Sequence, residues 1–342
     1  MSEFKSPFPY FGGKSSIADM VWSRFGDTPN YVEPFFGSGA MLLSRPNWSP
    51  DKGLIETGND ASGFVANFWR AVRNVPDEVA YHADWPSNEN DLHARHAWLV
   101  GQSDQLVSRL EGDPDFYDTR IAGWWVWGMS CWIGGGFCSG NGPWQRVQDD
   151  DGSWQLVHLG DAGQGVNRKL VHLGDAGQGV NRKLVHLGDA NGNAGTGEQG
   201  LYAWMEALSE RLARVRVCCG DWSRVCGPTP TFKNGLTAVF LDPPYTADAG
   251  RMSNLYEKDC LQVGHAVAAW CKENQDNPLL RIALCGYEGE YDLPSWECVA
   301  WKANGGYGNQ SAGTGRDNAN KERVWFSPHC LRPDSKRQMS LF

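Results

Sequence analysis

The sequence lacks any long apolar run. No stretch of its 342 residues approaches the roughly 20 consecutive apolar residues that a membrane-spanning helix requires. The first ten residues, MSEFKSPFPY, also lack the apolar core of a secretion signal. These absences predict a cytoplasmic protein that does not associate with a membrane.

Paired cysteine motifs and an excess of positive charge are missing as well. The ten cysteines include no Cys-x-x-Cys pair, and Cys218 and Cys219 are adjacent, which suits neither a zinc site nor a disulfide framework. We therefore expect reduced thiols and no metal. With 31 Lys and Arg against 40 Asp and Glu, the net charge of -9 excludes a surface that is basic throughout. A nucleic-acid enzyme remains compatible, because only the face toward the nucleic acid must be basic.

Short β-branched or apolar runs bounded by turn residues occur in both halves of the chain. They predict strands at 31–33, 53–55, 215–217, 238–241, 280–284 and 323–326, with helices at 62–72, 202–213 and 261–273 between them. This alternation is typical of an α/β fold with a mostly parallel, Rossmann-like doubly wound sheet. Such sheets bind ligands at the carboxyl ends of their strands.

The alternation is lost between about residues 81 and 200. A tryptophan-rich helical stretch at 121–132 runs into three glycines, and residues 157–170 are repeated without change at 171–184. We expect 81–200 to be an insertion in a catalytic domain formed by 1–80 and 201–342. The repeats carry side chains of the kinds that contact phosphates and base edges, namely Gln164, Asn167, Arg168, Lys169, Gln178, Asn181, Arg182 and Lys183. The alternative is a duplicated surface loop without such a role.

Residues 31–40 predict a strand that runs directly into a glycine-rich turn and a helix. The turn has the form Phe-x-Gly-x-Gly, and its glycines allow a tight turn and a close approach to a ligand. After the next strand, Asp60 stands where a ribose diol requires an acceptor for its hydroxyl groups. Asp60 is also suited to cap the helix that follows, and the two roles are compatible.

The most specific motif is Asp242-Pro243-Pro244-Tyr245, which ends an apolar strand. Two prolines end the hydrogen bonding between strands, because they have no N–H group, and leave backbone carbonyls free to accept hydrogen bonds. An acid, a carbonyl and an aromatic plane therefore meet at the end of a central strand, which fits a flat substrate with an NH2 group. The amino nitrogen of adenine is a poor nucleophile until it approaches tetrahedral geometry, and acceptors from Asp242 and Pro243 favour that geometry. Tyr245 is expected to stack on the base, which must leave the duplex to reach the pocket.

In their order, these motifs resemble the Dam-type family of N6-adenine DNA methyltransferases. The resemblance covers about residues 7–73 and 200–328, with a Gly-Gly-Lys element, the glycine turn, an inserted recognition domain and then Asp-Pro-Pro-Tyr. It implies a methyltransferase fold, S-adenosyl-L-methionine as cofactor and double-stranded DNA as partner, and it leaves a homodimer open. The repeats resemble those of phage-type or solitary members, which implies an enzyme without a partner nuclease. At 128–137 the chain departs from the family's DNA-opening segment, so no target sequence is implied.

The resemblance also implies roles for individual residues. Tyr10 and Lys14 match positions that hold the methionine part of the cofactor, and Asp60 matches the ribose-binding acid. The matching cofactor loop comprises Glu33, Pro34, Phe35, Gly37, Ser38 and Gly39. Asp221 and Trp222 resemble the segment that contacts the cofactor's adenine, and the alternative for this pair is an ordinary strand end with a core tryptophan. Arg316 lies in a stretch similar to the family's last motif and is a candidate for DNA contact, against the alternative of a plain loop.

Two other kinds of function stay open at this point. A methyltransferase acting on another planar amino group, in an RNA base, cytosine N4 or a protein glutamine, would need a similar corner. The acid at Asp242 favours adenine, because such enzymes more often carry Asn or Ser there. A non-catalytic DNA-binding relative is the second alternative, and the intact Asp242 and glycine turn argue against it.

Overall fold

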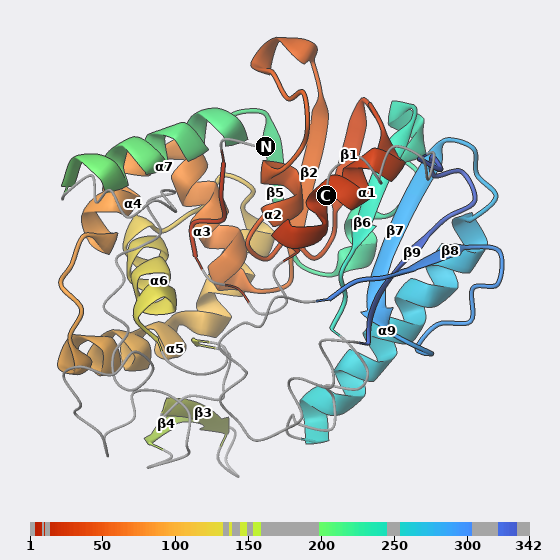
Figure 1. Ribbon diagram of the computed structural model, residues 1–342. Helices are drawn as coiled ribbons and strands as arrows, with labels where there is room; N and C mark the ends of the chain where they lie inside the picture. The colour runs from red at the N-terminus through yellow and green to blue at the C-terminus, as the bar shows by residue number, and fades with distance from the viewer. Residues whose placement is uncertain are drawn as a thin grey trace.

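The computed structural model describes residues 4–8, 10, 14–132, 137–138, 144–148, 153–158, 198–244, 254–302 and 321–333 (Figure 1). Its centre is a seven-stranded sheet with the order β5-β2-β1-β6-β7-β9-β8. The strands are β1 (Asn30–Glu33), β2 (Ile55–Asp60), β5 (Val215–Cys219), β6 (Thr237–Leu241), β7 (Leu280–Tyr287), β8 (Glu297–Ala300) and β9 (Glu322–Phe326). Six of these strands run in one direction, and β9 runs in the opposite direction. The expected Rossmann-like, mostly parallel sheet is confirmed.

Both faces of the sheet are covered by apolar clusters that include helices. Successive side chains of a strand point to opposite faces, so one strand contributes to both clusters. In β6, Ala238 and Phe240 belong to one apolar cluster, while Val239 and Leu241 belong to the other. The first cluster includes residues of α1 (Ala18–Phe25), α2 (Ala40–Leu43), α3 (Gly63–Asn74) and α7 (Glu198–Leu212). The second includes residues of α9 (Asn254–Asn274) and of the short 3-10 helix Trp222–Val225. Strands buried on both faces read as continuous apolar runs, which explains the pattern of 238–241.

Some element boundaries differ from the sequence expectation. A strand was expected at 53–55, but β2 begins at Ile55 and continues to Asp60. Gly53 instead ends the 3-10 helix Pro50–Lys52 with a φ of 61°, a left-handed conformation that glycine adopts without strain. The edge strand β8 was not expected, because its four residues alternate in exposure and form no apolar run.

The middle of the chain is largely helical in its described part. It contains α4 (Pro76–Ala83), α5 (Glu89–Gly112) and α6 (Thr119–Cys131), followed by the hairpin of β3 (Trp144–Gln148) and β4 (Trp154–His158). Leu99 and Leu106 of α5 and Trp125 of α6 lie in the same apolar cluster as Phe68 and Trp69 of α3. These helices therefore pack directly against the part of the chain that carries the glycine turn. The assignment of 81–200 to target recognition stays a prediction.

Three further observations concern the expected absences. No helix among the described residues is long and apolar enough to cross a membrane. The cysteines whose side chains are described are all free thiols. No cluster of His, Cys, Asp and Glu suited to a metal ion occurs in the described part of the chain.

Candidate functional site

The carboxyl ends of four parallel strands meet at one edge of the sheet. Strand β1 lies between β2 and β6, and β5 lies on the far side of β2. Asn59, near the end of β2, fixes this edge because its Nδ2 donates to the carbonyls of Pro34 (3.1 Å) and Gly220 (3.0 Å). The backbone carbonyl of Asn59 accepts from Phe36 N at 2.8 Å. One side chain thus ties together the segments that follow β1 and β5.

The glycine turn after β1 depends on its glycines. Gly37 and Gly39 have φ values of 46° and 64°, which L side chains rarely adopt. A Cβ atom on Gly37 would lie 2.7 Å from the ring of Tyr10, so the ring is packed directly on the turn. The carbonyl of Gly37 accepts from Nε1 of the buried Trp69 at 2.8 Å. The turn is therefore held from both sides, with Tyr10 on one and α3 on the other.

Asp60 links the end of β2 to this turn. Its carboxylate accepts from Gly37 N through Oδ2 and from Ser62 N through Oδ1, each at 2.8 Å. Burial raises the pKa of Asp60 to about 6, although these two hydrogen bonds act in the opposite direction. The expectation that Asp60 caps the following helix is wrong, because the N-cap of α3 is Ser62, whose hydroxyl accepts from Val65 N. Asp60 thus positions the loop while keeping further lone pairs for a ligand.

Glu33 is a second acid at the same edge. It is 3% exposed, and the hydroxyl of Tyr31 donates to its Oε2 at 2.8 Å. Burial raises its pKa well above the usual value, and the charges of Asp242 and Asp60 add to the increase. Three acids therefore converge where β1, β2 and β6 end.

Lys14 supplies the positive charge among these acids. Its Nζ lies 3.0 Å from Oδ1 of Asp242, and its side chain is 4% exposed, against 22% for Asp242. Burial lowers the pKa of Lys14, but the negative charge of Asp242 and nearby acids outweighs burial, so the pKa lies above its usual value. The structure thus brings a residue matched to cofactor binding together with the residue matched to catalysis. Pro243 is buried beside them and Pro244 is exposed.

The segment after β5 fits the alternative interpretation in part. Trp222 is 8% exposed and packs in the apolar cluster beneath α9. Its ring also lies nearly parallel to that of Phe35, with centroids 6.3 Å apart and planes inclined by 24°. Asp221 is exposed and caps the short 3-10 helix by accepting from Ser223 N at 2.9 Å. The pair of rings forms an apolar wall beside the end of β5.

Two other residues of the loop are buried, and several candidates fall outside the described residues. Pro34 and Ser38 are buried, and the hydroxyl of Ser6 donates to Ser38 Oγ at 3.3 Å. The structure does not describe Tyr245, Gln164, Asn167, Arg168, Lys169, Gln178, Asn181, Arg182, Lys183 or Arg316. Their roles stay predictions.

Three residues that hold the turn and the strand ends in place were not identified from the sequence. Asn59 precedes Asp60 directly, yet its side chain bonds to carbonyls that lie far away in the sequence. Trp69 was read only as part of an apolar helix, because the pattern does not reveal that its Nε1 reaches Gly37. Tyr31 likewise looked like a strand residue.

A sheet of this order, with a glycine turn after its first strand and acids at the adjoining strand ends, defines a Rossmann-like methyltransferase. Residues 10–97 match the family model of the D12 class N6 adenine-specific DNA methyltransferases, a stretch that includes Tyr10, the turn and Asp60. The match covers about a quarter of the chain and supports the resemblance to the Dam-type family, whose members are enzymes that methylate N6 of adenine in DNA. Methyltransferases of this kind generally use S-adenosylmethionine. No curated protein matches the chain.

Proposed function

We propose that this protein transfers the methyl group of S-adenosyl-L-methionine to N6 of an adenine that has been swung out of duplex DNA, with the carboxylate of Asp242 as the catalytic group. The observation that carries the assignment is the position of Asp242. It follows β6 directly, it pairs with Lys14 at 3.0 Å, and its charge acts on both Tyr10 and Glu33 of the glycine-turn region. The acid and the turn therefore share one site.

The donor set fits the chemistry of the cofactor. S-adenosylmethionine presents an ammonium group and ribose hydroxyls, which donate, and a carboxylate, which accepts. Glu33 and Asp60 supply buried acceptors, and Lys14 supplies a buried cation. The wall of Phe35 and Trp222 is suited to the cofactor's adenine ring. When bound, the cofactor supplies an electrophilic methyl group on a sulfonium.

The protein's own part in the reaction is to hold the amino group. Asp242 and the Pro243 carbonyl accept the two N–H bonds of the adenine amino group, and Tyr245 stacks on the ring. This arrangement draws the nitrogen toward tetrahedral geometry, so that its lone pair can form the N–C bond as the C–S bond breaks. The nitrogen then carries a positive charge, which the carboxylate of Asp242 stabilises until the extra proton leaves to water. Lys14 orients that carboxylate through the ion pair.

The test compares Asp242→Ala with a control acid. Unmethylated duplex DNA is incubated with methyl-labelled cofactor, and the nucleosides are separated after digestion. We expect N6-methyladenine with the wild-type protein, a loss of about 100- to 1,000-fold in rate for Asp242→Ala, and an unchanged rate for Asp276→Ala, an exposed acid. Binding of S-adenosylhomocysteine should persist in Asp242→Ala. A variant with normal turnover would remove Asp242 from the mechanism, and label in cytosine or in protein would refute the adenine assignment.

The insertion is proposed to select the DNA sequence. Deleting residues 171–184 removes one full repeat together with its basic and amide side chains. We expect weaker or altered DNA binding with unchanged S-adenosylhomocysteine affinity, measured by gel shift and by calorimetry. Unchanged DNA recognition would make the repeat a spacer. Action as a homodimer and a cytoplasmic location remain predictions.

A further inference from the structure

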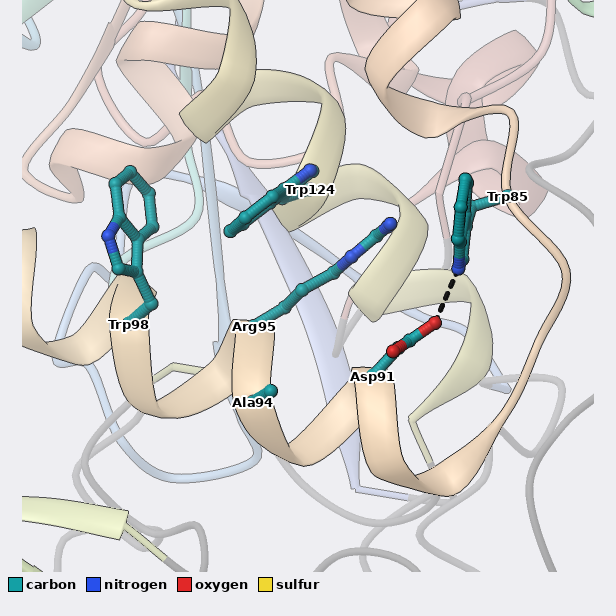
Figure 2. Close-up of a pocket in the computed structure, with 6 residues that line it drawn as sticks. All are labelled: Trp85, Asp91, Ala94, Arg95, Trp98 and Trp124. Atoms are coloured by element: carbon teal, nitrogen blue, oxygen red, sulfur yellow. Dashed lines mark hydrogen bonds between the residues drawn. The ribbon is translucent and has the colours of Figure 1, made fainter.

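A hollow outside the proposed methyl-transfer site lies between α5, α6 and the segment that joins α4 to α5 (Figure 2). Its volume is about 340 Å³, near the lower end of the range for small-molecule sites. The residues that line it are Trp85, Asp91, Ala94, Arg95, Trp98 and Trp124. The hollow shares no residue with the proposed methyl-transfer site.

Arg95 is the unusual member of this lining. Its guanidinium lies 4.3 Å from the ring centre of Trp127, 5.0 Å from that of Trp124 and 5.2 Å from that of Trp85. The residue is only 9% exposed, and its Nη1 has no hydrogen-bond partner among the described residues. A buried N–H group without a hydrogen-bond acceptor is costly, and contact with the indole rings compensates only part of the lost hydration. Arg95 therefore brings a guanidinium with unused hydrogen-bonding capacity to the wall of the hollow.

Asp91 provides the complementary acceptor. The indole Nε1 of Trp85 donates to its Oδ2 (Figure 2), and the amide Nδ2 of Asn88 donates to the same oxygen. These bonds fix the carboxylate while Oδ1 keeps its capacity to accept. A donor from Arg95 and an acceptor from Asp91, one helical turn apart on α5, thus lie among flat indole surfaces. This combination suits a flat, polar-edged ring.

A second cation lies against two of the indoles that line the hollow. Trp98 and Trp124 meet edge to face with centroids 5.1 Å apart, and the guanidinium of Arg120 lies 4.6 Å from the first ring and 4.9 Å from the second. Arg120 is exposed. Its charge is therefore available to a phosphate attached to a ring bound within.

We propose that this hollow is a guanine-nucleotide site, in which Arg95 donates to O6 and N7 of the base and Oδ1 of Asp91 accepts from its N1–H group. Guanine is the DNA base that presents two adjacent acceptors to an arginine on one edge. The indoles pack on the ring, and Arg120 attracts the phosphate. The guanine has two conceivable sources, a free nucleotide or a base displaced from DNA, and both have the same recognition chemistry. The site goes beyond the proposed methyl transfer.

The test is calorimetric titration of the full chain with guanosine, cytidine and uridine 5′-monophosphates. Saturating S-adenosylhomocysteine is present throughout, so that the nucleotides do not occupy the methyl-transfer site. A single-stranded oligonucleotide with one central guanine, and the same oligonucleotide with thymine there, form a second arm. We expect guanosine monophosphate to bind at least tenfold more tightly than the two pyrimidine nucleotides. Arg95→Met should reduce that affinity at least tenfold.

Matched variants distinguish recognition from folding. Arg109→Met is the control, because Arg109 is an arginine of the same helix stacked on Phe116 at 3.8 Å, away from the hollow. It should leave guanine affinity unchanged, and Asp91→Asn should reduce the preference for guanine. Trp85→Leu is a further test, because the Trp85 side chain is 47% exposed and the stability of the fold depends little on it. We expect it to weaken binding while the melting temperature stays close to that of the wild-type protein.

The outcomes separate this site from the proposed function. Guanine-dependent binding of only the mononucleotide identifies a free nucleotide as ligand, and guanine-dependent binding of the oligonucleotide identifies DNA. Equal affinity for all nucleotides, or affinity that Arg95→Met leaves unchanged, overturns the proposal. Methylation of DNA by the same preparations is measured in parallel. A protein that methylates DNA without binding guanine disproves this site alone, and one that binds guanine without methylating DNA disproves the proposed function alone.

Discussion

The substitution Glu56→Gln should be among the most destabilising single changes in the catalytic part. Glu56, in β2, is 3% exposed and receives Arg45 Nη1 at 3.0 Å. Arg211 of α7 donates to both of its oxygens, at 2.7 and 2.9 Å, and also to the carbonyl of Leu42 at 2.7 Å. One carboxylate therefore balances two buried guanidinium groups and connects β2 with α2 and α7.

The glutamine keeps the shape of the side chain and removes its charge. Two buried cations then lack their counter-charge, and breaking a buried ion pair in this way typically costs about 3–5 kcal/mol. That is a large share of the roughly 5–15 kcal/mol by which a domain is stable. Equilibrium unfolding in urea, followed by far-UV circular dichroism and tryptophan fluorescence, measures the loss. We also expect weaker binding of S-adenosylhomocysteine, because α2 follows the glycine turn directly.

The matched control is Glu111→Gln. Glu111 forms an ion pair with Arg224 at 3.8 Å, but both side chains are about half exposed, so the expected loss is within about 1 kcal/mol. If Glu56→Gln lost no more stability than Glu111→Gln, burial would not govern the strength of this ion network, and the reasoning would be refuted.

Three further predictions concern pH and the glycine turn. Burial lowers the pKa of His96 to about 4, so the unfolded chain binds more protons than the folded one between pH 6.5 and 4. The unfolding free energy should therefore fall by up to about 3 kcal/mol as the pH is lowered from 6.5 to 4. Urea unfolding at several pH values measures this loss, which should be smaller in His96→Phe and unchanged in His265→Gln, a variant of an exposed histidine. Because the pKa of Asp60 is about 6, S-adenosylhomocysteine affinity should fall up to about tenfold from pH 7 to pH 5 in calorimetry, and a flat profile would exclude the charged form of Asp60 as its partner. Gly37→Ala should weaken the same affinity at least tenfold, since the new Cβ would lie 2.7 Å from Tyr10 and φ is 46°; wild-type affinity would show that the turn tolerates a side chain.

The sequence was most informative where function depends on neighbouring residues. The glycine turn and the Asp242 corner are short motifs that directly follow buried strands, and parallel strands bring their carboxyl ends to one edge. The apolar runs therefore predicted the sheet, and the motifs predicted which edge carries the site. The ion pair of Lys14 with Asp242 could not be predicted, because it joins distant segments and depends on the packed positions of both.

Helix α5 illustrates why the middle region was harder to interpret. Its buried positions include Leu92, Leu99 and Leu106, but Arg95 and His96 are buried between them. These polar residues interrupt the apolar periodicity from which a helix is inferred. They are tolerated because aromatic rings surround them, with His96 stacked on Trp132 at 5.0 Å and Arg95 enclosed by indoles. The buried Arg95 that interrupts the apolar periodicity of α5 also lines the hollow beside this helix.

Two consecutive residues of α3 link that helical region to the cofactor turn. Trp69 donates to the carbonyl of Gly37, while Arg70 donates to the carbonyls of Leu110 (3.1 Å) and Asp113 (3.0 Å) at the end of α5 and to Val217 (3.0 Å) in β5. A cation that binds the last carbonyls of a helix also interacts favourably with the negative end of its dipole. Helix α3 therefore holds the turn with one side chain and anchors α5 with the next. Since α5 also contacts β3 of the hairpin, α3 is one helix through which DNA held by the insertion would be placed relative to the methyl-transfer site.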